Sequence, residues 1–221
     1  MIIVWQAFDV HPGASKAEVK SAGRAASRAA FVQAAERWQL AHGEAAWQRA
    51  SIVHDTEGAP VIDARGAPAI SLTHGHGLAG CAIAAPTQAW IGLDAELTRA
   101  PGMRAVRELA ARTGEHALAW PDNDWPARLW CAKEAVVKAE RTAADLLGRT
   151  LSAVEVRAVA DLVRTPWVLG AACATGAASL ELPLEVVIRS HRDRAFVVHT
   201  ARLGAFTVAA VRDNPSEPGQ G

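Results

Sequence analysis

The alternation of hydrophobic and polar residues predicts a chain in which strands and helices follow one another. The apolar run from Ile2 to Phe8 predicts a first strand, and the Lys-, Arg- and Ala-rich stretch from about Ser15 to His42 predicts a long helix. Glycine and proline residues between positions 58 and 68 predict loops. The next segment, AISLTHGHGLAGCAIAAP, predicts two short strands joined by a glycine-rich turn, and WIGLDAELT at 90–98 predicts another strand.

The second half of the chain repeats this mixture. A helix is predicted over about Met103 to Arg112, followed by the polar loop WPDNDWP and a helix over Ala127 to Glu140. Four alternating segments come next and are typical of strands in an antiparallel sheet: LSAVEVRAV, LEVVIRS, RAFVVHT and GAFTVAAV. The polar tail DNPSEPGQG, residues 213–221, is predicted to be disordered.

One comparison within the chain suggests that its two halves are related. When His74 is laid over His199, an offset of 125 residues, Leu78 meets Leu203. At the same offset the alanines at 84 and 85 meet the alanines at 209 and 210. A chance match between alanine-rich strands is the alternative to an internal duplication.

Composition narrows the classes of partner. The 221 residues include 23 Lys and Arg against 23 Asp and Glu, so no overall field attracts the chain to nucleic acid or to an anionic membrane. The first ten residues hold no basic leader, and the apolar run breaks at Asp9 and His11, so we expect a cytoplasmic protein. Cys81, Cys131 and Cys173 lie in apolar contexts and are predicted to be small buried residues without chemistry.

The strand in WIGLDAELT ends with two acids on one face. Because alternate side chains of a strand share a face, Gly92, Asp94 and Glu96 point to the same side. One interpretation is a strand that reaches the surface and carries solvated acids. The other is a pair of oxygen ligands for a divalent cation, with Gly92 leaving room for an approach to the backbone.

The segment RLWCAKEAVVKAE, residues 128–140, contributes a third acid. On a helix Trp130, Glu134 and Lys138 are spaced four residues apart and lie on one stripe. Glu/Lys pairs of this kind are common on solvated helix faces. Here the same turns carry several alanines and valines, so we expect Glu134 and Lys138 to line a cleft.

Two of these segments together resemble the signature of the 4'-phosphopantetheinyl transferases. IGLDAE, followed 40 residues later (134 minus 94) by WCAKEAVVKA, is similar to the family pattern (I/V)G(I/V/L)D-x-E, a comparable spacer, and (F/W)(S/C/T)xKEAxxKA. RGAPAISLTHG, residues 65–75, resembles a third block found in the longer, surfactin-synthetase-type members. The resemblance covers residues 59–140.

The resemblance implies an α/β (α+β) fold of two similar halves, each a small antiparallel sheet packed with helix, related by a pseudo-twofold axis. We expect residues 1–98 to form the N-terminal half and residues 99–212 the C-terminal half, with the active site between them. The implied reaction is Mg²⁺-dependent transfer of 4'-phosphopantetheine from coenzyme A to a serine of an apo acyl or peptidyl carrier protein, releasing adenosine 3',5'-bisphosphate. The expected partners are coenzyme A and the carrier, without nucleic acid or membrane, and the protein is expected to be a monomer.

The resemblance also implies roles for the acids and the nearby lysines. Asp94, Glu96 and Glu134 would hold Mg²⁺, which would bridge the pyrophosphate of coenzyme A. Glu134 would accept the proton of the carrier serine, directly or through water, and Lys138 would stabilise the leaving group. Lys133, about 100° around the helix from Glu134, could support the site or lie at its rim.

The third block implies part of the coenzyme A site. Thr73 and His74 stand in the place of the family's Ser-His pair, and His74 would bind the 3'-phosphate. The lysine that the family carries in this block is Ala67 here. Arg65, two positions earlier, could reach the same anion. His76 has no counterpart in the pattern.

The first predicted helix supplies the remaining candidates. Arg24 and Arg28 are four residues apart on one helical face, and either could hold the 3'-phosphate, with Arg28 preferred. Two solvated arginines are the alternative interpretation. AERTAADLLG, residues 139–148, replaces a glycine-rich segment of the family, so the shape of the pantetheine channel stays open.

Two other functions stay open at this point. One is a non-catalytic module that binds coenzyme A or a carrier protein, and the retention of three acids with Lys138 argues against it. The other is an unrelated Mg²⁺-dependent phosphohydrolase that uses Asp94 and Glu96. Its products would be free phosphopantetheine or phosphate rather than a modified protein.

Overall fold

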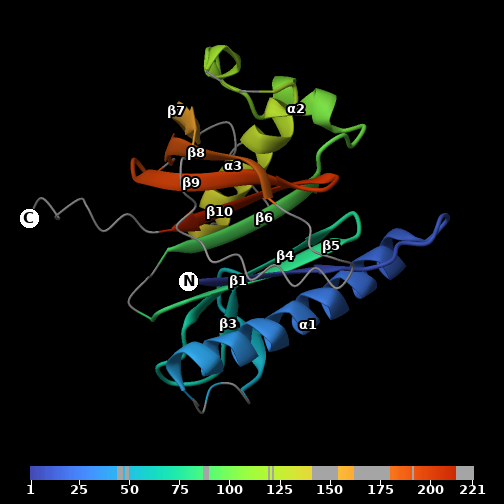
Figure 1. Ribbon diagram of the computed structural model, residues 1–221, viewed down its shortest axis with the longest axis vertical. Helices are drawn as coiled ribbons and strands as arrows, with labels where there is room; N and C mark the ends of the chain where they lie inside the picture. The colour runs from blue at the N-terminus through green and yellow to red at the C-terminus, as the bar shows by residue number, and fades with distance from the viewer. Residues whose placement is uncertain are drawn as a thin grey trace, which may run out of the picture.

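The structure, a computed structural model, describes residues 1–43, 47, 50–86, 90–118, 120, 122–140, 154–161, 180–190 and 192–212. It confirms a mixed α/β fold with antiparallel sheets, in which one sheet lies with α1 and the other with α2 and α3 (Figure 1). Three features of the sequence lie outside the described residues: Cys173, the tail 213–221, and positions 141–148 of the segment after the last helix.

The first sheet contains β1 (Ile2–Ala7), β5 (Leu78–Ala84) and β4 (Ala69–Gly75) in the order β1-β5-β4, all antiparallel. Helix α1 (Lys16–His42) packs against it. Ser15 caps this helix, because its hydroxyl accepts from the Glu18 N–H while the Glu18 carboxylate accepts from the Ser15 N–H. The buried face of α1 consists mostly of small residues, which brings the helix close to the strands.

A short hairpin lies where the sequence predicts only loops. It pairs β2 (Ile52–His54) with β3 (Pro60–Ile62), and its register places His54 opposite Pro60. Each strand has three residues, which is too short for a clear alternating pattern. The hairpin is relevant to the site because it borders the groove described below.

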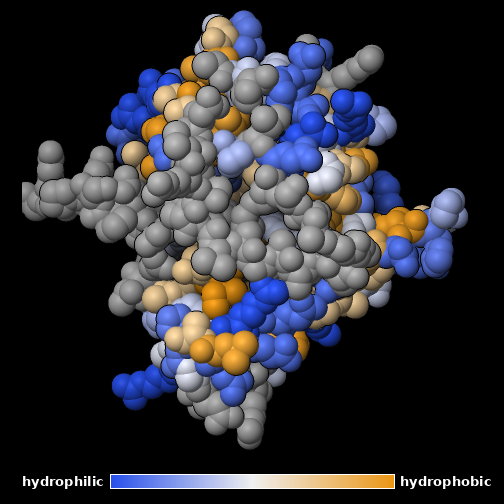
Figure 2. Space-filling model, viewed as in Figure 1, coloured by the Kyte–Doolittle hydropathy of each residue, from blue (hydrophilic) through white to orange (hydrophobic). Residues whose placement is uncertain are grey.

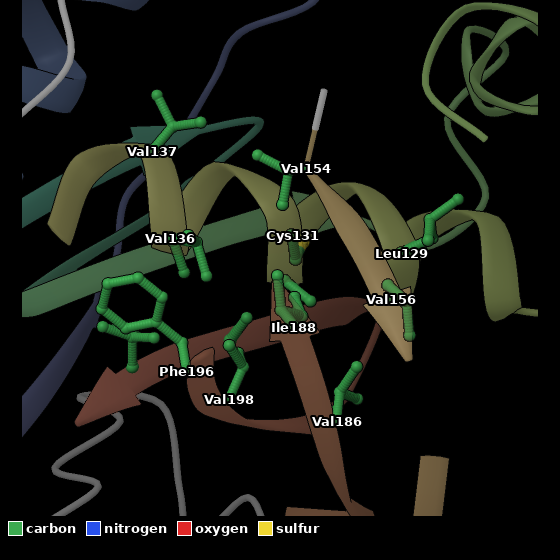
Figure 3. Packing of buried hydrophobic residues seen from close by; sticks show 14 of the residues in the cluster. Leu129, Cys131, Val136, Val137, Val154, Val156, Val186, Ile188, Phe196 and Val198 are labelled. Carbon is green, nitrogen blue, oxygen red and sulfur yellow. The ribbon is translucent and has the colours of Figure 1, made fainter. Parts of the chain in front are cut away.

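The second sheet has the order β6-β10-β9-β8-β7. Its strands are β6 (Ile91–Leu97), β7 (Glu155–Asp161), β8 (Leu180–Arg189), β9 (Ala195–Leu203) and β10 (Phe206–Arg212). Helix α3 (Trp125–Ala139) covers one face, and its Leu129, Cys131 and Val136 pack with residues of the sheet such as Ile188 and Val198 (Figure 3). This buried cluster is the largest of the three apolar clusters among the described residues, and it holds α3 in place.

The connection between β6 and α3 runs from residue 98 to residue 124 and includes two short helical elements. Helix α2 (Met103–Leu109) ends earlier than the predicted Arg112, and its C-cap Ala110 donates to the Val106 carbonyl. A 3₁₀ turn, η2 (Glu115–Ala117), follows. Among the described residues no helix is both long and apolar enough to span a bilayer.

Strand β6 joins the two sheets. It is hydrogen-bonded to β10, yet its Leu93 N–H donates to the Ser71 hydroxyl of β4 at 3.0 Å. Its other face contributes Ile91, Leu93 and Ala95 to an apolar cluster that includes residues of both sheets, such as Trp5. The predicted division at residue 98 would place β6 in the N-terminal half, although its ladder belongs to the C-terminal sheet.

The two sheets share a pattern of connections. In each, a first strand (β1 or β6) pairs with the second strand of a hairpin (β4–β5 or β9–β10), and a helix packs on the same strands. Gly75 faces Leu78 across one hairpin turn, and Leu203 faces Phe206 across the other. The turns therefore coincide at an offset of 128 residues (203 minus 75), rather than at the 125 of the His74/His199 alignment.

Candidate functional site

The backbone of β6 is pressed against helix α3 at Gly92. A Cβ atom at this position would lie 1.7 Å from the Ala135 carbonyl oxygen, a distance that no pair of atoms tolerates. The sequence suggested that Gly92 leaves room for a ligand, but the helix fills that space. The contact brings the neighbouring Asp94 beneath the last turn of α3, where it is 3% exposed.

Asp94 is the centre of a polar network that spans three elements. Its Oδ1 accepts from the Lys138 ammonium of α3 at 2.6 Å and from the Thr73 hydroxyl of β4 at 3.2 Å. Lys138 also donates to Thr73 Oγ1 and to the Leu93 carbonyl, both at 3.3 Å. Burial acts to lower the pKa of Lys138, but the charges of Asp94 and Glu134 outweigh it and raise that pKa, so Lys138 stays cationic.

Glu96 and Glu134 lie around the same pair, and we call Asp94, Glu96 and Glu134 the acid cluster. Burial raises the pKa of Glu134 to about 7, and the charge of Asp94 adds to this while Lys138 opposes it. Burial and the charge of Asp94 also raise the pKa of Glu96 to about 7, with a smaller contribution from Glu134. Both carboxyls therefore exchange a proton near neutral pH, which suits an acid or base catalyst.

The acid cluster matches the chemistry of a divalent cation site only in part. Within the described ranges, no three His, Cys, Asp or Glu side chains are arranged closely enough to hold a metal ion. Oδ2 of Asp94 is nevertheless buried and without a hydrogen-bond partner among the described residues, and the charge of Asp94 raises the pKa of both glutamates. A cation bound by all three acids requires the Glu96 and Glu134 side chains to turn toward Asp94.

His76 is a neighbour of the acid cluster that the family pattern does not include. It occupies the turn between β4 and β5 with a φ of 52°, in the left-handed region that non-glycine residues seldom adopt. Its Nε2 lies 3.6 Å from Oε2 of Glu96. The exposed imidazole of His76 therefore borders the acid cluster.

His74 points instead to a groove beside helix α1. The groove has a volume of about 420 Å³, and we call it the basic groove because its polar lining is mostly cationic. It is lined by Lys20, Arg24, Ser27, Arg28, Ile52, His54, Pro60, Leu72 and His74. Figure 2 shows hydrophilic and hydrophobic residues side by side in the lower part of the view, where α1 crosses the molecule.

The position of His74 depends on a glycine of α1. A Cβ atom on Gly23 would lie 2.5 Å from Cδ2 of His74, so the imidazole packs directly on the helix backbone. Burial lowers the pKa of His74, and the positive charges of Lys138, Arg24 and Lys20 lower it further. An anion in the groove would reverse the effect of these charges.

The basic groove and the acid cluster meet at β4. Thr73 belongs to the network of Asp94, and the next residue, His74, lines the groove. The Ser27 hydroxyl lies 3.0 Å from the Gly23 carbonyl oxygen and 3.1 Å from the Thr73 carbonyl oxygen, which ties α1 to β4 at this point. The basic groove therefore borders the network around Asp94.

Two residues singled out in the sequence lie elsewhere. Arg65 is exposed in the turn between β3 and β4 and is not among the residues that line the basic groove, so its contact with coenzyme A stays a prediction. Lys133 is fully buried on the side of α3 away from the acid cluster, where its ammonium pairs with Glu115 at 2.8 Å. It therefore does not lie at the rim of the site.

The buried cysteines match the expectation of inert residues. Burial raises the pKa of the Cys81 thiol far above its ordinary value. Burial likewise raises the pKa of Cys131, and the charges of Asp94 and Glu96 contribute. Neither thiol ionises under ordinary conditions, so neither is a nucleophile.

Sequence reasoning missed Lys20, His54 and Glu115. Lys20 precedes Arg24 by four residues, as Arg24 precedes Arg28, so the helical stripe of three cations was visible in the sequence. His54 lies in the unpredicted hairpin, and no local pattern indicated it. Glu115 follows the end of α2 and meets Lys133 only through the tertiary fold.

Comparisons with known proteins complete the description of the site. No model of a protein family matches the chain, and no curated protein sequence matches it at a significant level.

Proposed function

We propose that this protein is a 4'-phosphopantetheinyl transferase that moves the phosphopantetheine arm of coenzyme A to a serine of an apo carrier protein. One observation carries the proposal. Successive residues of β4, Thr73 and His74, belong to a carboxylate and lysine network and to a cationic groove. Coenzyme A has a pyrophosphate and a separate 3'-phosphate, and it is the kind of ligand that needs both regions at once.

The basic groove is proposed to hold the 3'-phosphate. His74, Arg24, Arg28 and Lys20 supply positive charge or hydrogen-bond donors there. His74 gains a proton more readily once an anion compensates the cations around it. Arginine binds phosphate oxygens in bidentate fashion, which fixes the orientation of the nucleotide end.

The acid cluster and Lys138 are proposed to carry out the transfer. Glu134, with a pKa of about 7, accepts the proton of the serine hydroxyl. The serine oxygen forms a bond to the β-phosphorus of coenzyme A, and the bond from that phosphorus to the bridging oxygen breaks. Lys138, cationic and one turn from Glu134, stabilises the charge on the released adenosine 3',5'-bisphosphate.

Asp94, Glu96 and Glu134 would hold Mg²⁺ in this proposal. Bound Mg²⁺ neutralises charge on the pyrophosphate and orients it for displacement. Carboxylate oxygens are the ligands that Mg²⁺ prefers, and the unpartnered oxygen of Asp94 supports such a role.

The same proposal includes the arrangement of the whole chain. The matching connections of the two sheets support two similar halves related by a pseudo-twofold axis, with the active site where β4, β6 and α3 meet. We further propose that the protein is cytoplasmic, because acyl and peptidyl carrier proteins are soluble substrates, and that it acts as a monomer, because the proposed active site is built from one chain.

The test is to incubate the protein with Mg²⁺, coenzyme A and a panel of apo carrier proteins and to weigh the products. We expect one carrier or more to gain the mass of a single phosphopantetheine, and we expect Asp94→Asn to abolish the gain. Arg192→Ala serves as a control, because Arg192 is exposed in the turn between β8 and β9 and does not line the groove.

Two other results would contradict the proposed transferase activity. Binding of coenzyme A without modification of any carrier would contradict the transferase and favour a binding module. Release of free phosphopantetheine or phosphate without a carrier would instead indicate a hydrolase.

A further inference from the structure

A buried ion pair lies on the side of α3 that faces away from the acid cluster. Lys133 is 0% exposed and Glu115 is 2% exposed. The Lys133 ammonium donates to Glu115 Oε2 at 2.8 Å and to the Ala110 carbonyl, at the end of α2, at 2.6 Å. A lysine in such a place has no access to a substrate.

Glu115 joins further segments to the same point. Its Oε2 also accepts from the Arg112 N–H at 2.7 Å, and its Oε1 accepts from the Val156 N–H of β7 at 2.7 Å. The pair therefore connects α3 to the end of α2, to η2 and to the edge strand of the sheet. We call these contacts the Lys133–Glu115 clamp.

Stability alone is a poor explanation of the clamp. Removing two charges from water costs several kcal/mol, and buried ion pairs can often be replaced by apolar residues without loss of stability. Such a pair instead restricts the orientation of the segments that it joins, because each hydrogen bond requires a defined distance and angle between donor and acceptor. An apolar contact at the same place would define the orientation of its partners less sharply, because it has no preferred direction.

Rotation of α3 has consequences at the acid cluster. Glu134 follows Lys133 directly, and Lys138 lies little more than one turn further along the helix. The contact of Gly92 with Ala135 sets how closely α3 approaches β6, and the apolar cluster beneath α3 holds the helix on the sheet. The clamp acts on a face of α3 about 100° from Glu134 and adds directional hydrogen bonds that oppose rotation.

We propose that Lys133 and Glu115 are positioning residues that set the rotation of α3, so that Glu134 and Lys138 face Asp94. The geometric part of this proposal is independent of the reaction, whereas its effect on turnover rests on the proposed transferase function. In this proposal the clamp maintains the distance of 2.6 Å between the Lys138 ammonium and Asp94 Oδ1.

The test uses a double variant, Lys133→Met with Glu115→Gln, which removes both charges and keeps the volume. Lys133→Met alone leaves a buried carboxylate without its partner and is expected to unfold readily. The double variant is expected to melt within a few degrees of the wild type. A matched control is Arg112→Met with Glu155→Gln, which removes an exposed ion pair of 3.0 Å at the same end of the molecule.

The first measurement is a crystal structure of the double variant. We expect the contact between Lys138 and Asp94 to be lost while β6 and β10 keep their register, and we expect the control to retain the contact. A double variant that retains the contact overturns the proposal. This measurement tests the geometric part of the proposal even if the wild type has no transferase activity.

The second measurement is turnover with carrier and coenzyme A. We expect kcat of the double variant to fall by about 10²-fold with little change in KM, because a displacement near 1 Å at a catalytic group has an effect of that order. Turnover equal to that of the wild type overturns the catalytic role of the clamp. A wild type without turnover contradicts the proposed function, and the crystal structure still tests the role of the clamp.

Discussion

At the scale of single residues, the acid cluster shows how neighbours determine a carboxyl's behaviour. Asp94 is held by Lys138 and Thr73, so its charge is compensated on one oxygen. Glu96 and Glu134 lie in the field of that charge and are partly removed from water, and the pKa of each rises to about 7. Both glutamates thus keep a proton at a pH where a solvated glutamate is ionised, because of their surroundings.

This difference predicts an unusual dependence of stability on pH. Glu134 has an ordinary pKa of 4.5 and a folded-state pKa of about 7, so between these values the folded protein binds more protons than the unfolded one. Its contribution to the unfolding free energy is therefore fully present below about pH 4.5 and is lost as pH rises through 7. Glu134→Gln should gain stability relative to the wild type as pH rises across this window.

Urea denaturation between pH 5.5 and 8.5, without divalent cations, measures the effect. Subtracting the wild-type curve from the variant curve removes the contribution of groups that do not interact with Glu134, so the difference reports Glu134 together with its effect on Glu96. A difference that stays constant across the range would contradict the raised pKa. Added Mg²⁺ should flatten the wild-type curve if the acid cluster binds it, because the cation favours the ionised carboxylates.

The basic groove gives a second prediction at this scale. His74→Ala should weaken coenzyme A by about tenfold or more, since a hydrogen bond to a charged group contributes about 1.5–3 kcal/mol. Dephospho-coenzyme A, which lacks the 3'-phosphate, should bind almost equally to variant and wild type. Calorimetry with both ligands measures this, and His116→Ala is the matched control, because His116 is exposed in η2 and does not line the basic groove. An equal loss for both ligands would show that His74 does not contact the 3'-phosphate.

At the scale of elements, the critical contact is that between β6 and α3. It depends on one glycine, because any side chain at position 92 would overlap the backbone of the helix. The short approach is what allows an acid on the strand to meet Lys138 on the helix. A strand and a helix at an ordinary separation would leave Asp94 without this partner.

Gly92→Ala should therefore be severely destabilising. We expect a loss of about 3 kcal/mol or more in the free energy of unfolding, since backbone must move to relieve the overlap. Gly102→Ala is the matched control, because a Cβ atom there meets nothing within 4 Å and φ is −69°. Thermal and urea unfolding of both variants measure the difference. Equal stability of the two variants would contradict the close approach of α3.

At the scale of the whole molecule, β6 makes the two sheets interdependent. Its hydrogen bonds run to β10, and its apolar side chains pack with residues from β1, β5, β9 and β10. The active site proposed here lies at this junction, so displacement of one sheet relative to the other would separate Thr73 from Asp94. We infer that cohesion between the sheets is a requirement of the site.

The interdependence predicts that the chain unfolds in one transition. Leu93→Ala, at a position that is fully buried between the sheets, should cost about 2–5 kcal/mol and should shift the whole transition. Leu40→Ala is the control, because Leu40 is 88% exposed and its loss should change stability by about 0.5 kcal/mol or less. Calorimetry and circular dichroism measure both variants. A second transition in the Leu93 variant would show that the sheets unfold separately.

Local signals made much of the secondary structure predictable. Ser15 and Glu18 form a capping box at the predicted start of α1, and the alternating segments near the C-terminus match β8, β9 and β10. The glycine and proline residues between positions 58 and 68 predicted loops and did not indicate β3, because that strand is too short to show a period of two. The limits of α2 also differed, because no capping residue marks its end.

By itself the sequence determined which residues carry charge and on which face of an element they lie. The spacing of Gly92, Asp94 and Glu96 on a strand, and of Glu134 and Lys138 on a helix, follows from backbone geometry alone. Only the tertiary structure decided which of these faces meet. Three contacts join segments that are far apart in the chain: the pairing of β6 with β10, the approach of α3 at Gly92, and the burial of Lys133 against Glu115. Their energies arise from desolvation and close packing, which exist only once both partners are in place.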